Sequence, residues 1–346
     1  MTTSSFLDLF LLYEDDMIRI DKTGFSIVRN SADIEDFDYS QNTIRPTQDN
    51  NDLFRNIPRD TIISFLECED TNLYLQKTDD NKYELIAHNS IADESIKIEN
   101  LGNHFVAFAE AIEKSIDIKN HKKYDPSSPI ITNDFIKNIN HVLLVDSDKR
   151  KGVGEYRAED EFGRPQEVVI ANDNKVLRCV RLETSRENNV SQKMDELVNW
   201  VNNIDLEEST ENKLYNLAKF NADFIKIHPF VDGNGRTCRI LTNYLASILN
   251  IPLIDIPENA REQYVKALNY ANATNDFIFA YENDEYNEYN TDMQWKYHGR
   301  DDYSKYLPLA DFLQDHQVYN SNEIVSDILN YKNKNESRDL HADQIK

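Results

Sequence analysis

The chain has 346 residues, of which 40% are hydrophobic and 29% are charged, so it is long enough to bury a sizeable core and to hold more than one domain. It carries 62 Asp and Glu against 38 Lys and Arg, a formal net charge of -24. This field repels nucleic acids and anionic membranes, so a nucleic-acid-binding function is disfavoured. A ligand that carries phosphate must then be held by a local cluster of cations and backbone N–H groups.

The cysteines and the apolar runs indicate a compartment. Cys68, Cys179 and Cys238 lie far apart without CxxC spacing, which argues against a disulfide framework and against a zinc site. The early apolar run at 6–16 is short, contains Asp8 and lacks a basic leader, so it predicts a buried helix and not a secretion signal. The sequence has no apolar run long enough for a membrane-spanning helix. We therefore expect a cytoplasmic protein, and the sequence leaves secretion into a host cell open.

The first ninety residues predict a small α+β region. Segments 17–28 and 73–88 each contain two short extended runs around a polar turn, Thr78 to Asn81 in the second segment. This pattern is typical of β-hairpins.

Helical periodicity takes over from Asp93 onward and predicts a mainly helical domain. One hairpin interrupts it at 167–182, where two extended runs flank an Asn-Asp-Asn turn. The polar tail from Lys332 is expected to fray. The predicted helices are 101–116, 132–144, 190–203, 211–228, 235–250, 258–273, 306–313 and 322–331.

The stretch IKIHPFVDGNGRTCRI, residues 225–240, combines features of a phosphate site. A helix that runs into His228 is stopped by the following proline, and a new helix begins after a Gly-Asn-Gly turn. The N–H groups at that helix start, together with the positive end of the helix dipole, form a cradle for an anion. Arg236 and Arg239 project from the first turns of the same helix and add positive charge beside the cradle.

Two further side chains at this turn suit chemistry on a phosphate. Asp232 offers hard oxygen ligands for a Mg²⁺ ion that bridges phosphate oxygens. His228 is the only nearby side chain of a type whose unperturbed pKa suits proton abstraction near neutral pH. A metal site built from His228 and Asp232 is a weaker interpretation, because two further ligands at suitable spacing are missing.

Residues 228–239, HPFVDGNGRTCR, match the HPFx(D/E)GNGRxxR signature of the Fic (filamentation induced by cAMP) family at every specified position. The segments TNDFIKNINHVLL, GEYR (154–157), MDELVNWVN and REQYVKALNYAN resemble successive elements of the Fic core in the family's order. The resemblance covers about residues 93–285. It implies the Fic fold, a helical core with a β-hairpin flap.

The resemblance also implies an activity. Fic enzymes bind ATP with Mg²⁺ and transfer AMP to a Ser, Thr or Tyr hydroxyl of a target protein. By this resemblance His228 is the general base, Asp232 holds Mg²⁺, and Phe230 packs beneath the loop. The remaining site residues it implies bind the nucleotide and its phosphates: Gly233, Asn234, Gly235, Arg236, Arg239 and Asn272.

Residues 166–180 of the predicted hairpin resemble the Fic flap, which pairs with the backbone of the target protein as an added strand. The expected partners are therefore ATP and a protein substrate, with no nucleic acid and no membrane span. The oligomeric state is left open, a homo-oligomer included.

A second motif lies upstream. Ser95-x-x-x-Glu99-Asn100 resembles the (S/T)xxxE(G/N) inhibitory motif of Fic proteins, directly before the first core helix. The resemblance implies an inhibitory helix at about 91–100, in which Glu99 pairs with Arg239 and occupies the place of the γ-phosphate.

The sequence thus predicts a mainly α protein in three parts. These are an N-terminal α+β domain (1–90) of unknown role, a Fic domain (91–285) and a C-terminal helical extension with a polar tail (286–346). The predicted function is protein adenylyl transfer, autoinhibited in cis by a glutamate. The alternatives are removal of AMP or transfer of another phosphoryl-bearing group on the same fold, or a nucleotide-sensing interaction module without turnover.

Overall fold

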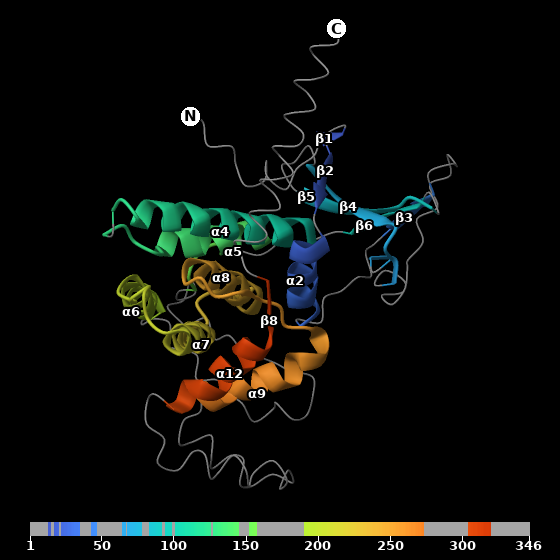
Figure 1. The fold of residues 1–346 in the computed structure, drawn as a ribbon. Helices are drawn as coiled ribbons and strands as arrows, with labels where there is room; N and C mark the ends of the chain where they lie inside the picture. Colours follow the sequence, from blue (N-terminus) through green and yellow to red (C-terminus); the bar gives the residue numbers. More distant parts are fainter. Residues whose placement is uncertain are drawn as a thin grey trace, which may run out of the picture.

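Helices dominate the protein from residue 101 onward, and strands dominate before it (Figure 1). The helices are α2 (Lys22–Asp33), α4 (Leu101–Lys122), α5 (Asn133–Leu144), α6 (Val190–Asn202), α7 (Thr210–Ile227), α8 (Asn234–Ile248), α9 (Arg261–Asn272) and α12 (Leu307–Asp315), with 3-10 turns η3 (Glu258–Ala260) and η4 (Ser304–Tyr306). The computed structural model describes residues 13–14, 17–20, 22–34, 43–46, 64–66, 68–77, 83–91, 94–98, 101–125, 127–144, 152–157, 190–272 and 304–319.

The N-terminal strands form one antiparallel sheet of six strands in the order β1-β2-β4-β5-β6-β3. A second sheet pairs β7 with β8. The strands are β1 (Tyr13–Glu14), β2 (Met17–Ile20), β3 (Thr43–Pro46), β4 (Thr71–Lys77), β5 (Tyr83–Asn89), β6 (Glu94–Ile98), β7 (Leu253–Ile254) and β8 (Gln317–Tyr319).

The hydrophobic core is built around α8. Every residue of this helix from Thr237 to Ile248 is buried, and a helix that is buried on all sides must be surrounded by other elements. Helices α4, α5, α7 and α2 and strand β7 all contact it. Figure 1 shows α4 and α5 side by side on one side of α8, with α7, α9 and α12 on the other. The start of α8, which carries the phosphate-site motif, is therefore fixed by the whole helical core.

Helix α7 shows why the sequence folds this way locally. The Ser209 hydroxyl caps its start by accepting a hydrogen bond from the backbone N–H of Asn212 at 3.3 Å. Leu214, Leu217 and Phe224 recur at helical spacing and are buried against the core. The helix ends at a defined residue, directly before the motif.

Most of the sequence-predicted elements are confirmed. The predicted helices at 101–116, 132–144, 190–203, 211–228, 235–250 and 306–313 correspond to α4 to α8 and α12, and 258–273 corresponds to η3 with α9. The hairpin at 73–88 is the β4–β5 pair. The fold is mainly α, with a small α+β region before the helical core.

The hairpin predicted at 17–28 is wrong in its second half. Met17–Ile20 form β2, but the chain then enters α2, where Phe25, Val28 and Ala32 recur at helical spacing and are buried. A short apolar run does not by itself distinguish a strand from a helix, and burial against α4 and α8 decides this one.

The inhibitory helix predicted at about 91–100 is also wrong over Glu94–Ile98, which form strand β6 between β5 and β3. Ser95 lies directly opposite His88 of β5, and the Ser95 hydroxyl is 3.0 Å from Nδ1 of His88. Pairing with two neighbouring strands fixes the extended conformation here. Glu99 and Asn100 lie outside the described residues.

Several predictions fall on residues that the structure does not describe. These are the helix at 322–331, the flap hairpin at 166–180 and the tail. The apolar run at 6–16 is described only at Tyr13–Glu14, which are strand β1. The division into three domains stays a prediction, although α2 packs against the helical core.

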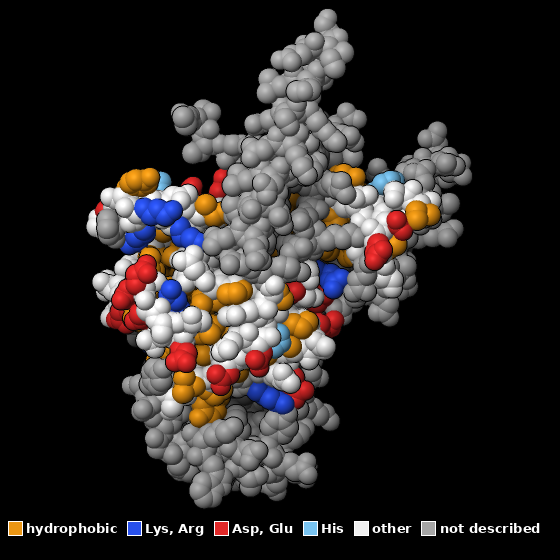
Figure 2. Space-filling view, in the orientation of Figure 1, with side chains coloured by type: hydrophobic (Ala, Val, Ile, Leu, Met, Phe, Trp, Pro, Cys, Tyr) orange, Lys and Arg blue, Asp and Glu red, His pale blue; other side chains and the backbone are white. Residues whose placement is uncertain are grey.

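Charged side chains on the surface are mixed in sign. On the face in Figure 2, Lys and Arg side chains gather at the end of α4 at the upper left, and acidic side chains spread over the helices below it. The last turn of α4 carries Lys119, His121 and Lys122, where cations interact favourably with the helix dipole. Within the described segments, no helix combines the length and apolar character that crossing a membrane requires.

Candidate active site

His228 sits where α7 ends and the motif loop begins. It is the C-cap of α7 and adopts a left-handed conformation with φ 51°, and its backbone N–H donates to the carbonyl of Phe224 at 2.9 Å. A non-glycine residue with positive φ is uncommon and needs support from its surroundings. The half-buried imidazole thus stands at a sharp turn between two helices.

Arg157, in the GEYR segment, supplies much of that support. Its Nε donates to the carbonyl of His228 at 2.7 Å, and its Nη2 donates to the carbonyl of Ile227 at 3.1 Å. Its backbone N–H donates to the carbonyl of Pro229 at 2.8 Å. Because Arg157 is only 3% exposed, these bonds are shielded from water and hold three successive carbonyls of the turn.

The loop is closed from within by Asn234. Its side-chain amide donates to the carbonyl of Phe230 at 2.8 Å and accepts from the backbone N–H of Phe230 at 2.9 Å. Phe230 itself is fully buried, with its ring near those of Tyr156 and Phe224. The prediction that Phe230 packs beneath the loop agrees with this position. The Asn234 side chain fixes the loop's shape, which leaves the backbone at the start of α8 to face a ligand.

Asn140 of α5 connects the loop to both of its neighbours. Its Nδ2 lies 3.1 Å from the carbonyl of Asp232 and 3.2 Å from the hydroxyl of Thr237, and its Oδ1 accepts from the N–H of Gly154 at 3.0 Å. This side chain is 1% exposed. One buried amide therefore joins the GEYR turn, the motif loop and the first turn of α8.

Gly233 is required at the start of α8 for two reasons. Its φ of 75° is costly for any residue with a Cβ, and an added Cβ would lie 3.0 Å from Leu144 and 3.1 Å from the Asn140 amide. Gly233 is also the N-cap residue of α8. Because it has no side chain, no side-chain oxygen of this residue accepts a hydrogen bond from the N–H groups at the helix start. The first N–H groups of α8 can therefore serve an anion.

Asp232 is suited to hold a Mg²⁺ ion together with a nucleotide. Its Oδ1 accepts from the backbone N–H of Gly233 at 2.8 Å, which orients the half-buried carboxylate at the edge of the loop. Mg²⁺ commonly binds through one carboxylate plus phosphate oxygens and water, so a single Asp is a sufficient protein ligand. Among the described residues there is no group of three or more His, Cys, Asp or Glu side chains that could hold a metal ion by themselves.

Arg239, one turn into α8, is 6% exposed and contacts α2. Its Nε donates to the Ser31 hydroxyl at 2.9 Å, and its Nη2 donates to the Ser31 carbonyl at 2.6 Å. The sequence predicted Glu99 as the partner of this guanidinium. Glu99 lies outside the described residues, so that pairing stays a prediction; within the described part of the chain, Arg239 donates to neutral oxygen atoms of α2.

Helix α2 is fastened to the core at further points. The carboxylate of Asp255, next to β7, accepts from the hydroxyl of Ser26 at 3.0 Å and from the amide of Asn30 at 2.8 Å. Arg261 Nε donates to the carbonyl of Ile34 at 2.6 Å. With its buried apolar face, α2 is docked against α4, α8 and η3.

His104, in the first turn of α4, faces the same region. It is 1% exposed, and neither ring nitrogen has a hydrogen-bond partner among the described residues. Burial lowers the pKa of His104 well below its ordinary value of 6.5, and the positive charges of Arg236 and Arg239 lower it further. The imidazole is therefore neutral at physiological pH.

The structure brings most of the predicted site residues together. His228, Asp232, Gly233, Asn234, Gly235, Arg236 and Arg239 all lie on the loop and the first two turns of α8. Asn272 is the last residue of α9, and its side chain lies outside the described part of the chain, as does all of Glu99. Ser95 belongs to β6.

Sequence reasoning missed Arg157, Asn140 and Ser31 as site residues. Arg157 lies in the GEYR segment, which resembles a Fic element, and this position was the available signal. Asn140 and Ser31 gave no signal, because a buried Asn on a helix and a Ser three residues beyond the predicted hairpin are identified only by what they contact.

Comparison with known proteins agrees with the sequence motif. Residues 130–246 match the sequence profile of the Fic/DOC family. Residues 130–246 are a Fic domain.

The curated relatives are similar to about a quarter of this chain. A protein adenylyltransferase fic-1 of Caenorhabditis elegans is 31% identical over 83 residues, which are 24% of this chain and 16% of the relative. A protein adenylyltransferase Fic of Drosophila mojavensis is 39% identical over 80 residues, 23% of this chain and 15% of the relative. The aligned part thus spans about a sixth of each relative.

Solved structures of Fic proteins resemble the chain over a longer span. A Fic domain containing signalling protein of Bacteroides thetaiotaomicron has a TM-score of 0.43 and 18% identity, covering 86% of this chain and 83% of that one. A Fic family protein of Desulfovibrio desulfuricans has a TM-score of 0.40 and 16% identity, covering 88% of this chain and 65% of that one.

The loop clamp can be tested by Arg157→Lys, which keeps the charge but cannot hold two carbonyls through a fork of N–H groups. We expect the free energy of unfolding to fall by about 2 kcal/mol, because at least one buried carbonyl loses its donor. Urea denaturation measures it, with Lys137→Arg as the control, since Lys137 pairs with the exposed Glu155. Equal stability of Arg157→Lys and wild type would contradict the clamp.

Proposed function

We propose that the protein is an adenylyltransferase that moves AMP from ATP to a hydroxyl group of a protein. The observation that carries the proposal is the rigid loop that holds His228 beside an uncapped helix start with Arg236 and Arg239 on its first turns. The loop and the first two turns of α8 thereby bring together a proton acceptor, an anion cradle and cations for the outer phosphates. The names of the adenylyltransferases that share this domain support the same reaction.

The chemistry assigns one step to each group. His228 takes the proton of the incoming hydroxyl as its oxygen attacks the α-phosphorus, and the bond from this phosphorus to the bridging oxygen breaks, so that pyrophosphate leaves. The N–H groups at the start of α8 stabilise the negative charge on the α-phosphate in the transition state. Arg236 and Arg239 neutralise the outer phosphates. When bound, Mg²⁺ would be held by Asp232 and supply further charge neutralisation to the departing pyrophosphate.

Rigidity of the loop supports catalysis by positioning. Holding a base and an electrophile in reacting geometry can supply about 7 to 11 kcal/mol of the barrier reduction. The Arg157 clamp, the Asn234–Phe230 pair and the Asn140 bridge all keep His228 fixed relative to the start of α8. These residues are positioning groups and do not themselves react.

The assigned base is tested by His228→Ala. We expect transfer of labelled AMP from ATP to the protein itself or to a target to be abolished, while binding of ATP stays nearly unchanged, because the base acts on the hydroxyl and not on the phosphates. The exposed His121→Ala is the control. A His228→Ala protein that transfers AMP at the wild-type rate would refute the role of His228.

We further propose that α2 restrains this activity in cis. An outer phosphate needs the guanidinium of Arg239, whose Nε and Nη2 here donate to Ser31. A phosphate group is negatively charged and can accept two parallel hydrogen bonds from a guanidinium, so a triphosphate competes with Ser31. It must also displace the buried apolar face of α2. If α2 is undocked in about 1% of molecules, the apparent affinity for ATP is reduced about a hundredfold.

Two variants separate α2 from the predicted inhibitor Glu99. Asp255→Ala removes the acceptor shared by Ser26 and Asn30, so AMP transfer should rise about tenfold for each 1.4 kcal/mol of docking free energy that is lost. Glu99→Gly should leave transfer unchanged if α2 alone restrains the site. Rates of AMP transfer measure both variants. A large increase in Glu99→Gly with none in Asp255→Ala would assign the inhibition to Glu99.

A further inference from the structure

Burial of His104 destabilises the state in which α2 is docked, and the contacts in that state do not compensate for it. Both ring nitrogens are buried without a hydrogen-bond partner, and leaving such polar atoms unsatisfied destabilises a protein. An apolar side chain of similar shape would avoid this cost. The imidazole therefore suits a second state of the molecule in which its nitrogens have a partner.

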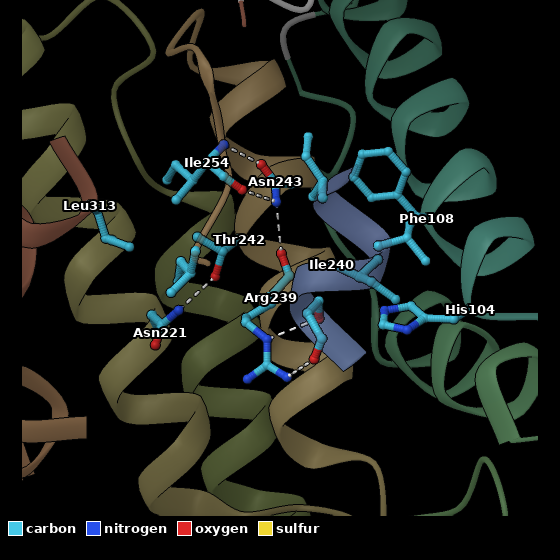
Figure 3. A pocket seen from close by; sticks show the side chains of 13 residues that line it. His104, Phe108, Asn221, Arg239, Ile240, Thr242, Asn243, Ile254 and Leu313 are labelled. Carbon is cyan, nitrogen blue, oxygen red and sulfur yellow. Dashed lines mark hydrogen bonds between the residues drawn. The ribbon is translucent and has the colours of Figure 1, made fainter. Parts of the chain in front are cut away.

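The place of that partner is indicated by the cavity which His104 lines. Figure 3 shows His104 from α4 and Arg239 from α8 reaching the same pocket, with the blue ribbon of α2 between them. From α2 itself, Ile27, Val28 and Ser31 line this pocket. The cavity holds about 20 Å³, which is room for about one water molecule and too little for a phosphate group. A phosphate can enter only if α2 moves aside.

We propose that His104 is a third ligand of the outer phosphates: once α2 is displaced, its imidazole donates a hydrogen bond to the phosphate group that also binds Arg239. The phosphate takes the space that α2 vacates. It then accepts hydrogen bonds from His104 and Arg239, the two side chains that face α2 in the docked state. This inference rests on the proposed function, because it extends the nucleotide site assigned there.

The charges around His104 differ in sign between the two states. With α2 docked, the charged groups that act on it among the described residues are Arg236 and Arg239 of α8, and both oppose a positive imidazole. The residues that line the pocket from α7, β7 and α12 are uncharged, as are those from α2. Arg29 and Asp33 of α2 lie on the opposite face of that helix from Ile27 and Ser31. A bound triphosphate adds several negative charges and reverses the local field.

The proton balance follows from this reversal. His104 binds no proton at neutral pH when α2 is docked, because burial and the arginines depress its pKa. A neighbouring phosphate raises the pKa of an imidazole, so His104 gains a proton when the triphosphate binds. The bound state then holds more protons than the free state, and the affinity for the triphosphate must increase as pH falls between the two pKa values.

Calorimetric titrations in two buffers of different ionisation enthalpy measure this proton uptake. The probes are the α,β-methylene analogue of ATP, which cannot transfer AMP, and AMP. Wild type should take up as much as one proton more per triphosphate analogue than His104→Gln, and AMP should show no such difference. The comparison with His104→Gln removes the protons exchanged by the nucleotide itself, and His121→Gln, an exposed histidine on the same helix, is the control.

A second variant should change stability and triphosphate affinity in opposite directions. His104→Phe removes two unsatisfied nitrogens, so the melting temperature of the nucleotide-free protein should rise or stay equal. Its affinity for the triphosphate analogue should fall about 10- to 100-fold, the loss of one charge-assisted hydrogen bond, with AMP affinity unchanged. A merely structural histidine would give lower stability and equal losses for both nucleotides.

The outcomes separate the two proposals. Equal proton uptake and equal triphosphate affinity in wild type and the His104 variants, with AMP transfer intact, would overturn the role of His104 alone. Failure of wild type to bind either nucleotide would overturn the proposed function, and the role of His104 with it.

Discussion

The contact between Arg239 and Ser31 is the constraint on which the rest of the site depends. It joins α8, the central helix of the core, to α2, a helix from the N-terminal part of the chain. The same guanidinium cannot donate to Ser31 and to a phosphate through the same N–H groups. In the proposed mechanism, docking of α2 and binding of a triphosphate therefore compete for this guanidinium, and the affinity for nucleotide is set by the difference between the two free energies.

The proposed mechanism requires the loop to stay rigid and the helix α2 to undock. The loop must be rigid, and buried polar side chains, Arg157, Asn140 and Asn234, hold it through backbone atoms. Helix α2 must be able to leave, and its polar fastenings to Asp255 and Arg239 can be replaced by water or by phosphate. Its apolar face sets the cost of leaving, because each large apolar side chain that is uncovered costs about 1.5 to 3 kcal/mol. His104 lowers that cost if it finds a partner in the undocked state.

The sequence predicted the local features of the site and missed those made by tertiary contact. The motif at 228–239 is contiguous, so the cradle, the base and the arginines could be assigned from spacing alone. The helix α2 was missed because a run of four residues such as Phe25–Val28 fits a strand as well as a helix until its neighbours bury it. The helix predicted at 91–100 was wrong over Glu94–Ile98 because three specified positions do not outweigh pairing of β6 with β5 and β3. The contact between Arg239 and Ser31 could not be predicted, since the two residues lie 208 positions apart and Ser31 has no distinctive chemistry.

Hydrogen exchange at the backbone amides of α2 tests the competition most directly, because exchange reports how often a helix opens. The α,β-methylene analogue of ATP, with Mg²⁺, should accelerate exchange in Lys22–Asp33, and AMP should not, because AMP lacks the outer phosphates that displace Ser31 from Arg239. Helix α7 supplies the internal reference, since its exchange should not accelerate with either nucleotide. Unchanged or slower exchange of α2 with the triphosphate bound would contradict the account.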